Sequence, residues 1–564
     1  MFDLKIIPAI QKGWDLLRKY ILTIPRFDLF LQGALLIVIF LESNVFLLLR
    51  RNDSTGFIHT INQDWVKIGI GVVEFFLGVL VAWQGKGWRN FMLSFWLGIT
   101  AIFGLIILAF PFPNTNVPEV ELCNGGSISE YTEVVDPHRT VRGVFLVITA
   151  VLCGLTKISV WAHGITYLDD HEPQNGPYFY GILISIRLSL GLSGTNWLRP
   201  TSMREDWWEA QVSLSMLTLM FSILYTLFPR QMPTYKEVDT LERTCLLEPL
   251  RRVLKNRSLI LQSLGLSFLT TAIFGFNNYE TSLLQTKFYV ETIRQDPRTS
   301  RVIIDIFRSL VIIFFVSIFR MRFSGRRSDG VKAKTASIVG GGVAVFAGIL
   351  FSVLAALRCN TGQMAGFDGD YRQPECSIQC GCSSETYGFT PVCAIDTQTT
   401  YFSPCHAGCN HYESLNGFLV LQNCTCGAQT HRAVRGGCSL LPSCALTYNI
   451  YLVFFTVMLA AGASSLLMQG MVILRCTRRI DKPLAVGVAF AIMGLVSHAL
   501  GHFLYMLISD LTCAYRVNGV CIFHSDIVWI MPVVSVVFCL ISAAFSFAAS
   551  RASVSKVVAL NGVS

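Results

Sequence analysis

Residues 390–409 read TPVCAIDTQTTYFSPCHAGC, a compact cysteine cluster in a chain whose other long stretches are apolar. The 564 residues are 52% hydrophobic and only 14% charged. Because soluble globular proteins carry more charge and fewer apolar residues, this composition predicts an integral membrane protein. The cluster is therefore expected in a loop outside the bilayer.

Apolar segments long enough to cross a bilayer, about 20 residues each, lie on both sides of the cluster. The segment before the first of them is basic and shows no cleavable signal peptide. We count twelve predicted spans, with ends that can slip by several residues: 27–49, 62–84, 88–110, 142–167, 177–199, 207–229, 258–281, 299–319, 335–357, 446–471, 484–509 and 527–549.

The loops after the second, sixth, eighth and tenth spans are rich in lysine and arginine, which favours the cytoplasm. Both termini of this multi-pass protein are therefore predicted to be cytoplasmic, with the plasma membrane as its location. One loop on the same side, YLDDHEP (167–173), is acidic, but acidic residues count little in this rule. The net charge of +9 follows from the same bias, so we expect anionic membrane lipids as neighbours and no nucleic-acid partner.

Spans and loops together predict how the chain is organised. The loop 230–257 is the longest on the cytoplasmic side and divides six spans from six. The predicted parts are a cytoplasmic N-terminus (1–26), a first six-helix bundle (27–229), a cytoplasmic linker (230–257), helices seven to nine (258–357), an extracellular cysteine-rich domain (358–445), helices ten to twelve (446–549) and a cytoplasmic tail (550–564).

Eleven of the 18 cysteines fall in the external segment between spans nine and ten: Cys359, Cys376, Cys380, Cys382, Cys393, Cys405, Cys409, Cys424, Cys426, Cys438 and Cys444. Such density predicts disulfides, because about ninety residues with few aliphatic side chains cannot gain enough stability from a core. Zinc is the alternative. Extracellular thiols tend to oxidise, so we expect no metal site.

An odd number of cysteines leaves one of them without a partner in the same segment. Cys123 is the lone cysteine of the external loop between spans three and four, and we expect it to form that bond. The bond would tie the cysteine-rich segment to the first half of the protein. Cys513 and Cys521 are close enough in sequence to close their own loop.

Asparagine sequons add an expectation about glycosylation. Asn52 in NDS and Asn423 in NCT lie on predicted external loops, so both are expected to be modified. Asn256 in NRS faces the cytoplasm and should remain unmodified.

The opening stretch resembles the Kazal inhibitor motif, since PVC is followed after eleven residues by Cys405, with TYFSPC between and Cys409 four residues on. Further stretches make most of the chain similar to the organic anion transporting polypeptide family: HGITYLDDHEPQNGPYFYGILISIRL, ECSIQCGCSSE, NCTCG and CAYRVNGVC. The chain departs from the family in the tryptophan-rich signature before span six, reduced here to REDWWEAQV. It also has Gly494 where a basic residue is often found in span eleven.

The resemblance implies an all-α membrane protein of the major-facilitator type, with twelve transmembrane helices in a 6+6 bundle and a small disulfide-rich, Kazal-like extracellular domain. It implies secondary active, sodium-independent transport of amphipathic organic anions, such as steroid conjugates and bile-salt-like, eicosanoid or hormone-like compounds. Gly78, Leu80, Gly85 and Lys86 are similar to the gating loop of the superfamily. The acidic residue of that loop is replaced by Ala82, so we expect softened control of the inward gate.

No catalytic or energy-coupling motif accompanies these features. Lys86 is followed by Gly87 rather than Ser or Thr, and neither G-x-S-x-G nor H-E-x-x-H occurs, so we expect no enzyme and no cofactor. Two alternatives to transport stay open. The eroded signature suggests a transport-deficient receptor or scaffold, and the module suggests a membrane-anchored Kazal-type protein that binds a protease or another extracellular protein.

Ionisable residues inside spans are costly and therefore candidates for function. Arg187 and Lys157, cations of the neighbouring spans five and four, are predicted to hold the anionic group of the substrate. The alternative is that Glu74 or Glu42 neutralises them as a structural pair. Because a mid-membrane guanidinium is costly facing lipid, Arg187 is expected to face the bundle interior.

Two further pairs lie inside the predicted spans. His498 and His502 are four residues apart on one helix face, where they could carry a proton, line the pore or hydrogen-bond to neighbouring helices. Asp305 and Arg308 are three apart, and we expect them to satisfy each other as a structural pair.

Overall fold

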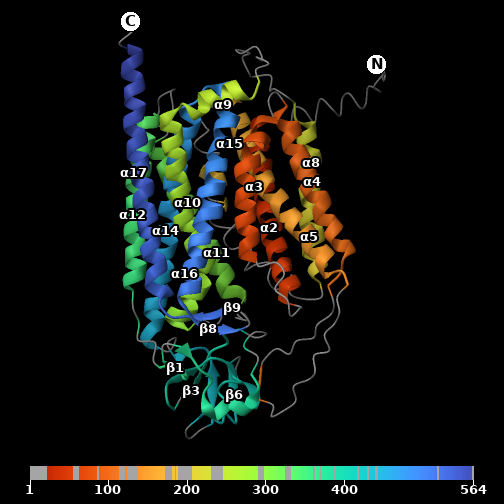
Figure 1. The fold of residues 1–564 in the computed structure, drawn as a ribbon, viewed down its shortest axis with the longest axis vertical. Helices are drawn as coiled ribbons and strands as arrows, with labels where there is room; N and C mark the ends of the chain where they lie inside the picture. The colour runs from red at the N-terminus through yellow and green to blue at the C-terminus, as the bar shows by residue number, and fades with distance from the viewer. Residues whose placement is uncertain are drawn as a thin grey trace.

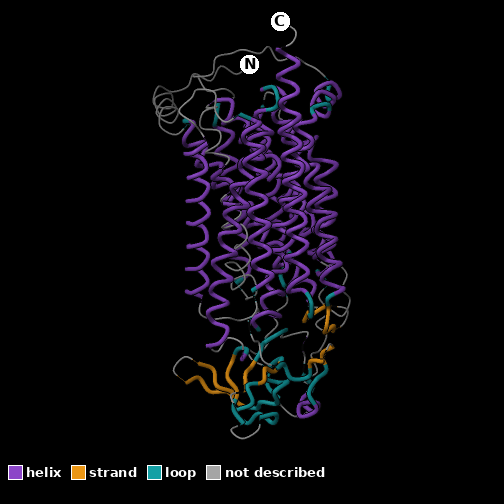
Figure 2. The backbone as a smooth tube through the Cα atoms, turned by 90° about the vertical axis from the view of Figure 1, so that its left-hand side faces the viewer, coloured by secondary structure: helices purple, strands orange, loops and turns teal. Residues whose placement is uncertain are grey.

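A computed structural model of the chain describes residues 22–54, 63–84, 88–112, 121–123, 137–171, 181–184, 186–187, 206–229, 245–289, 298–323 and 332–561, apart from short gaps at 358, 360–362, 369, 383, 385–387, 395, 416–417, 428–430, 439–441 and 518–519. Long helices run side by side through the body of the molecule, and the strands gather at one end (Figure 2). We call that end the module end and the opposite one the distal end.

The first part of the chain supplies the helices coloured red to yellow in Figure 1. In this part α4 packs against α5 and α8, and α2 packs against α5 and α8, so these helices form one bundle, the first half. The elements are α2 (Ile24–Ser54), α3 (Gln63–Gln84), α4 (Arg89–Ile106), the 3-10 turn η1 (Ile107–Ala109), α5 (Arg139–Ser159), the π-helical turn η2 (Val160–Ile165), α6 (Thr166–His171) and α8 (Trp207–Leu227).

The second half follows after the short helix α9 (Leu247–Leu254), which lies across the distal end within the segment predicted as a linker (Figure 1). Here α17 packs along α10 and α12, and α14 packs along α12. The elements are α10 (Arg257–Phe288), α11 (Arg298–Phe323), α12 (Ala333–Ala356), α14 (Pro442–Arg475), the 3-10 turn η5 (Arg479–Asp481), α15 (Lys482–Met493), the π-helical segment η6 (Gly494–Gly501), α16 (His502–Leu511) and α17 (Ile527–Asn561).

Ten helices among the described residues are long and apolar enough to cross a membrane. They coincide with predicted spans one to four, six, seven and nine to twelve. The eighth predicted span falls in α11, where the apolar part, Ile306–Ile318, is shorter, and the fifth (177–199) lies mostly outside the described residues. The predicted helical membrane protein with a small disulfide-rich domain is confirmed.

The two halves meet where α3 packs along α15, η6 and α16. Small residues let these backbones approach closely. A Cβ atom on Gly71 would lie 2.7 Å from the carbonyl oxygen of Gly494 and 2.8 Å from the carbonyl carbon of His498. Side chains larger than glycine would separate the helices, so Gly71 keeps polar groups of the two halves within reach of each other.

The module, residues 359–444, contains a five-stranded antiparallel sheet in the order β4-β3-β7-β6-β5. In its centre Cys393 of β3 lies opposite Thr400 of β4 and Val434 of β7. A separate hairpin of β8 and β9 connects α16 to α17. The module elements are β1 (Phe367–Asp368), β2 (Asp370–Tyr371), the 3-10 helix η3 (Glu375–Cys380), β3 (Val392–Ala394), β4 (Thr399–Tyr401), β5 (His411–Leu415), β6 (Phe418–Gln422) and β7 (Ala433–Arg435), and the hairpin is β8 (Cys513–Val517) with β9 (Val520–His524).

Disulfides staple the module and fasten it to its surroundings. Cys123 is bonded to Cys380, the tether to the first half that cysteine parity predicts, and its backbone N–H donates to the carbonyl of Cys409 at 2.8 Å. The hairpin is closed by Cys513–Cys521. Five bonds lie within the module: Cys359–Cys444, Cys376–Cys426, Cys382–Cys405, Cys393–Cys438 and Cys409–Cys424.

An aromatic cluster fastens the module to the second half. The ring of Phe389 lies 5.2 Å from Phe402 in the module and 5.2 Å from Phe523 in β9. Tyr371 approaches Tyr515 of β8 at 4.7 Å. Such aromatic pairs each contribute about 0.5 to 1.5 kcal/mol beyond their buried area. The module is therefore held by both halves: a disulfide joins it to the first half, and aromatic packing adds to its chain connections with α12 and α14 of the second.

The structure argues against Asn52 as a glycosylation site. Asn52 is 6% exposed, its Oδ1 accepts a hydrogen bond from Arg142 Nε at 2.8 Å, and its Nδ2 donates to the Arg139 carbonyl at 3.3 Å. A glycan needs an exposed Nδ2, so modification of Asn52 stays a prediction that this packing does not favour. Asn423 is exposed, follows β6 directly and has a left-handed backbone (φ 55°), and it stays a proposed acceptor.

His406 is a buried titratable group in the module. Its Nδ1 lies 2.8 Å from Ser403 Oγ, and its Nε2 lies 3.3 Å from Ser384 Oγ, which also contacts the Tyr515 hydroxyl. Burial lowers the pKa of His406 to about 4. A histidine in an unfolded chain titrates near pH 6.5, so between these values the unfolded state binds more protons and stability falls as the pH drops.

We therefore expect acid to destabilise the module. Between pH 7.4 and 5.0, His406 alone should lower the free energy of unfolding by roughly 2 kcal/mol. Melting of the purified full chain at the two pH values measures this, and His406→Gln, which does not titrate, should lose less stability than the wild type. His411→Gln, at an exposed position of β5, is the matched control. Equal acid sensitivity of wild type and His406→Gln would contradict the prediction.

Candidate functional site

Lys157 and Glu42 form an ion pair inside the first half. The Nζ atom of Lys157 on α5 lies 2.6 and 2.7 Å from the two carboxylate oxygens of Glu42 on α2. The two side chains are 10% and 17% exposed. Because both oxygens share one ammonium group, the charge of Lys157 is compensated within its own half. The structure thus favours a structural pair over the predicted role of Lys157 as a substrate contact.

Glu74 on α3 makes a contact between the halves. It is 2% exposed, and its Oε2 contacts Nδ1 of His498 on η6. Lys157 and Arg187 act on the same carboxylate electrostatically. The contact joins α3 to η6, so it exists only while these two helices are packed together.

Asp64 and His502 make a second contact between the halves, nearer the module end. His502 Nε2 on α16 lies 3.1 Å from Asp64 Oδ1 on α3, and its Nδ1 lies 3.4 Å from Asn278 Nδ2 on α10. Tyr279 stacks on the imidazole at 6.3 Å. Lys67 lies one turn along α3, 3.9 Å from Asp64. Both histidines of span eleven therefore face acidic partners of the other half.

Arg187 belongs to the short described piece of predicted span five, residues 181–184 and 186–187. Its Cζ lies 5.0 Å from the ring centre of Phe274 on α10, a cation–π contact with the second half. The side chain is half-buried and acts electrostatically on Glu74. We call the following residues the central polar cluster: Glu42, Asp64, Glu74, Lys157, Arg187, His498 and His502.

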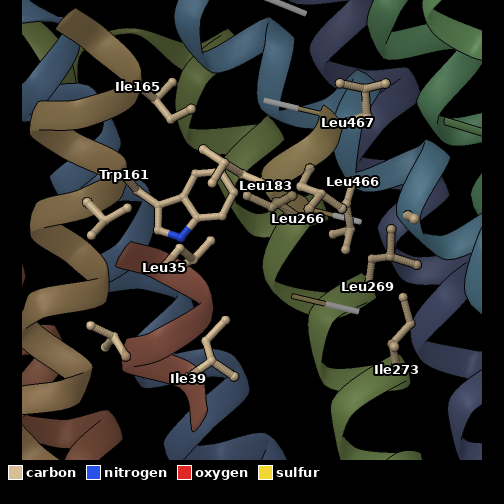
Figure 3. Packing of buried hydrophobic residues seen from close by; sticks show 14 of the residues in the cluster. Leu35, Ile39, Trp161, Ile165, Leu183, Leu266, Leu269, Ile273, Leu466 and Leu467 are labelled. Atoms are coloured by element: carbon tan, nitrogen blue, oxygen red, sulfur yellow. The ribbon is translucent and has the colours of Figure 1, made fainter. Parts of the chain in front are cut away.

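An apolar layer closes the space between the central polar cluster and the distal end. A cavity beside Trp161 and Phe490 measures about 20 Å³, room for about one water molecule. Within the described part of the chain, this cavity is therefore too small for an organic anion. Figure 3 shows its side chains converging from both halves: Leu35, Ile39, Trp161, Ile165, Leu183, Leu266, Leu269, Ile273, Leu466 and Leu467.

Five charged residues join the halves at the distal end, and we call them the distal charge network. Lys482, at the start of α15, lies 2.5 Å from Asp169 and 3.1 Å from Asp170, which end α6. Arg475 at the end of α14 lies 3.3 Å from Asp169, and Arg89 at the start of α4 lies 2.7 Å from Asp170. The Asp169 side chain is fully buried and that of Lys482 is 6% exposed. The network joins the two halves, and loss of one charge would leave its partners buried without compensation.

Sequence reasoning missed the distal charge network. The stretch around Asp169 and Asp170 was an exception to the enrichment of lysine and arginine in cytoplasmic loops, and no role was assigned to it. Two consecutive acidic residues at the end of span four, facing a basic loop on the same side, were the available signal. The expectation that Ala82 softens control of the inward gate stays a prediction.

Arg308 lies apart from the sites described above. It is 7% exposed, and its Cζ lies 5.0 Å from the ring centre of Phe455 on α14. The side chain of Asp305, its predicted partner, lies outside the described residues, so that pair stays a prediction. Within the part of the chain that the structure describes, no three His, Cys, Asp or Glu side chains are grouped to hold a metal ion.

Comparison with known proteins identifies a matching family and several relatives. The model of the Organic Anion Transporter Polypeptide (OATP) family matches residues 201–525. Solute carrier organic anion transporter family member 2B1 of Mus musculus is 25% identical over 483 residues, which cover 72% of this chain and 68% of the relative. Member 74D of Drosophila melanogaster is 23% identical over 400 residues, covering 64% and 47%. The chain thus spans from about half to two thirds of these relatives' length.

Two solved structures are similar at low sequence identity. A bacterial homolog of the human lysosomal transporter Spinster, inward-facing, is 12% identical with a TM-score of 0.44, over 93% of this chain and 97% of that one. The major facilitator superfamily transporter FucP, in the outward conformation, is 9% identical with a TM-score of 0.45, over 92% and 98%. The family match covers more than half of the sequence, and this multi-pass membrane protein belongs to the organic anion transporter polypeptide family.

Proposed function

We propose that the chain carries amphipathic organic anions, such as steroid conjugates, across the plasma membrane as a sodium-independent secondary transporter. Membership of the family supports organic anions as the substrate class. The proposed mechanism is alternating access, in which two six-helix halves open the central polar cluster to one side of the membrane at a time.

The observation that carries this proposal is Arg187 at the junction of the two halves. A guanidinium group is charged at every physiological pH and presents a planar fork that fits a carboxylate or sulfate. The ring of Phe274 beside it offers an apolar surface. A cation next to an aromatic face is complementary to an amphipathic anion, in which a charged group ends a hydrophobic body. Arg187 is therefore the proposed anion-binding residue.

The proposed orientation places the module outside the cell and both termini in the cytoplasm. Disulfides persist in oxidising surroundings, which supports an extracellular module. The distal charge network then lies on the cytoplasmic side, where it closes the inner end together with the apolar layer. Substrate release to the cytoplasm requires Lys482 and Arg475 to separate from Asp169.

Uptake into cells tests the proposal. Cells expressing the full chain should accumulate a radiolabelled sulfated steroid faster than mock-transfected cells, with saturation and without change when sodium is replaced by choline. Surface biotinylation shows that the protein is at the plasma membrane. Absence of uptake across a panel of steroid sulfates, glucuronides and bile salts, with the protein at the surface, would overturn the proposal and favour a receptor.

A further inference from the structure

The short helix α9 exposes two leucines at the distal end. Leu247 is 72% exposed and Leu254 is 51% exposed, and both lie on one side of the helix, about two turns apart. A different side of α9 packs on α10 and α15, with Pro249 and Val253 buried. Because exposed leucines that share one side of a helix are unfavourable in water, an apolar neighbour would stabilise this side.

The chain connection sets the depth of α9 in the membrane. Its last residue, Leu254, is three positions before Arg257, where the membrane-spanning helix α10 begins. Three residue steps reach at most about 11 Å, and the headgroup layer on each side of a bilayer is about 5 to 8 Å thick. Since α9 also lies across the ends of α10 and α15 (Figure 1), it is placed at the level of the lipid headgroups.

Basic residues accompany the exposed leucines. Arg251 lies about one turn from each of them on the helix surface, and Lys255 and Arg257 follow at the end of α9. All three cations are exposed, and Glu248 is the one acidic residue of the helix. Cations beside leucines are complementary to an anionic lipid, whose headgroup meets the charges while its acyl chains meet the apolar side chains.

Contacts with the second half hold α9 in place. Arg252 Nη2 lies 3.1 Å from Asp481 Oδ1, and Asn256 Nδ2 donates to the carbonyl oxygen of Cys476 at 2.8 Å. These contacts fix the helix at its middle and just beyond its end. The backbone that carries the exposed cations is therefore ordered before a lipid binds, so binding requires little further ordering of the protein.

We propose that α9 is a membrane-surface helix that binds an anionic lipid headgroup through Arg251 and Lys255, with Leu247 and Leu254 against the acyl chains. The guanidinium of Arg251 offers a planar fork that fits a phosphate, and Lys255 adds a point charge. The proposed orientation places α9 at the cytoplasmic leaflet, which carries the anionic lipids of a plasma membrane. This site is separate from Arg187, so it is tested without a transported anion.

A fluorophore on Cys245 tests the lipid site, because this cysteine is exposed and lies two residues before α9. It is labelled in the purified full chain in a Cys476→Ser background, where the other free cysteines, Cys153 and Cys539, are buried. The protein is then placed in phosphatidylcholine vesicles with a trace of spin-labelled lipid. Phosphatidylserine carrying the spin label should quench the fluorophore at least about fivefold more strongly than labelled phosphatidylcholine. Salt at about 0.5 M should remove most of this preference.

Charge variants show whether the preference comes from α9. In the double variant Arg251→Gln/Lys255→Gln the headgroup meets neutral side chains, so the two labelled lipids should quench almost equally. The matched control is Lys332→Gln/Lys334→Gln, which removes two exposed lysines at the start of α12. That control should keep the preference for phosphatidylserine, because it lowers the net charge of the protein by the same amount without changing α9.

The apolar part of the site has its own variant. Leu247→Gln/Leu254→Gln keeps every charge of α9 but removes the two exposed leucines. Quenching by both labelled lipids should then be largely lost, because the helix no longer inserts an apolar side between the headgroups and the acyl chains. The buried residues Pro249 and Val253 are unchanged, so the packing of α9 on the second half is retained.

Equal quenching by the two labelled lipids in the wild type would overturn the anionic-lipid site. An unchanged preference in Arg251→Gln/Lys255→Gln would overturn its assignment to α9. Absence of quenching by either lipid would show that α9 is covered by protein or lies away from the bilayer, and would overturn the proposal as well. None of these measurements uses a transported anion, so their failure leaves the proposed transport intact, and failure of steroid uptake leaves the lipid site intact.

Discussion

Replacing Asp169 with Asn should open the distal end of the protein. The carboxylate of Asp169 is fully buried and lies 2.5 Å from Lys482 and 3.3 Å from Arg475. Removing one partner of a buried ion pair costs about 3 to 5 kcal/mol, because the remaining charges stay desolvated without compensation. The packed arrangement of the halves should then lose stability by a factor of roughly 100 or more relative to the open one.

Cys476 reports this opening, since it is half-buried, free of disulfides and next to Arg475. Its rate of labelling by a membrane-impermeant maleimide, applied to inside-out vesicles in a Cys245→Ser background, should rise at least about tenfold in Asp169→Asn. Steroid uptake should fall, because the carrier no longer returns to the state with a closed inner end. Arg516→Gln, which breaks the exposed pair with Asp510 at the module end, should change neither measurement. Unchanged labelling in Asp169→Asn would show that the distal charge network does not hold the halves.

Replacing Arg187 with Gln should weaken anion uptake strongly at unchanged surface level. A hydrogen-bonded charge pair between Arg187 and the anion contributes about 1.5 to 3 kcal/mol, so KM should rise about ten- to a hundredfold. Arg187→Lys keeps the charge but loses the planar fork, and it should recover part of the affinity.

The comparison of the two Arg187 variants decides between binding and packing. If Arg187 only packs against Phe274, Gln and Lys should differ little in KM, because neither reproduces the guanidinium plane. Normal transport by Arg187→Gln would assign this residue to the helix packing and leave the anion site elsewhere.

Much of the helical body could be predicted from apolar composition. A segment in hydrocarbon must satisfy its backbone hydrogen bonds internally, which leaves one continuous helix of about 20 residues as the solution. The ends were less accurate, because helices continue into the polar layers on both sides. Thus α10 reaches Phe288 where 281 was predicted, and α17 reaches Asn561 where 549 was predicted.

The disulfides could be predicted only in part from the number and positions of the cysteines. Parity and position were enough to predict a bond from Cys123 to the module, but not its partner. The other pairs depend on strand register. Cys393 of β3 meets Cys438 only because β3 pairs with β7, three residues before Cys438. No spacing along the chain specifies that neighbour.

Contacts between distant spans were the least predictable part of the candidate site. The sequence left both Glu42 and Glu74 as partners for Lys157. In the structure, the orientation of the helices about their axes pairs Lys157 with Glu42. Lys482 and Asp169 are 313 residues apart, and their contact depends on how the two halves meet. The free-energy cost of a charged side chain in the membrane identified which charges must be buried. Only the packing of the helices decided how these charges pair.

A structure of the purified protein with a bound sulfated steroid, determined by cryo-electron microscopy, tests the central claim most directly. The account predicts the sulfate within hydrogen-bond distance of the Arg187 guanidinium, with the steroid body against Phe274 between the two halves. A steroid bound elsewhere, away from Arg187 and Phe274, would contradict it.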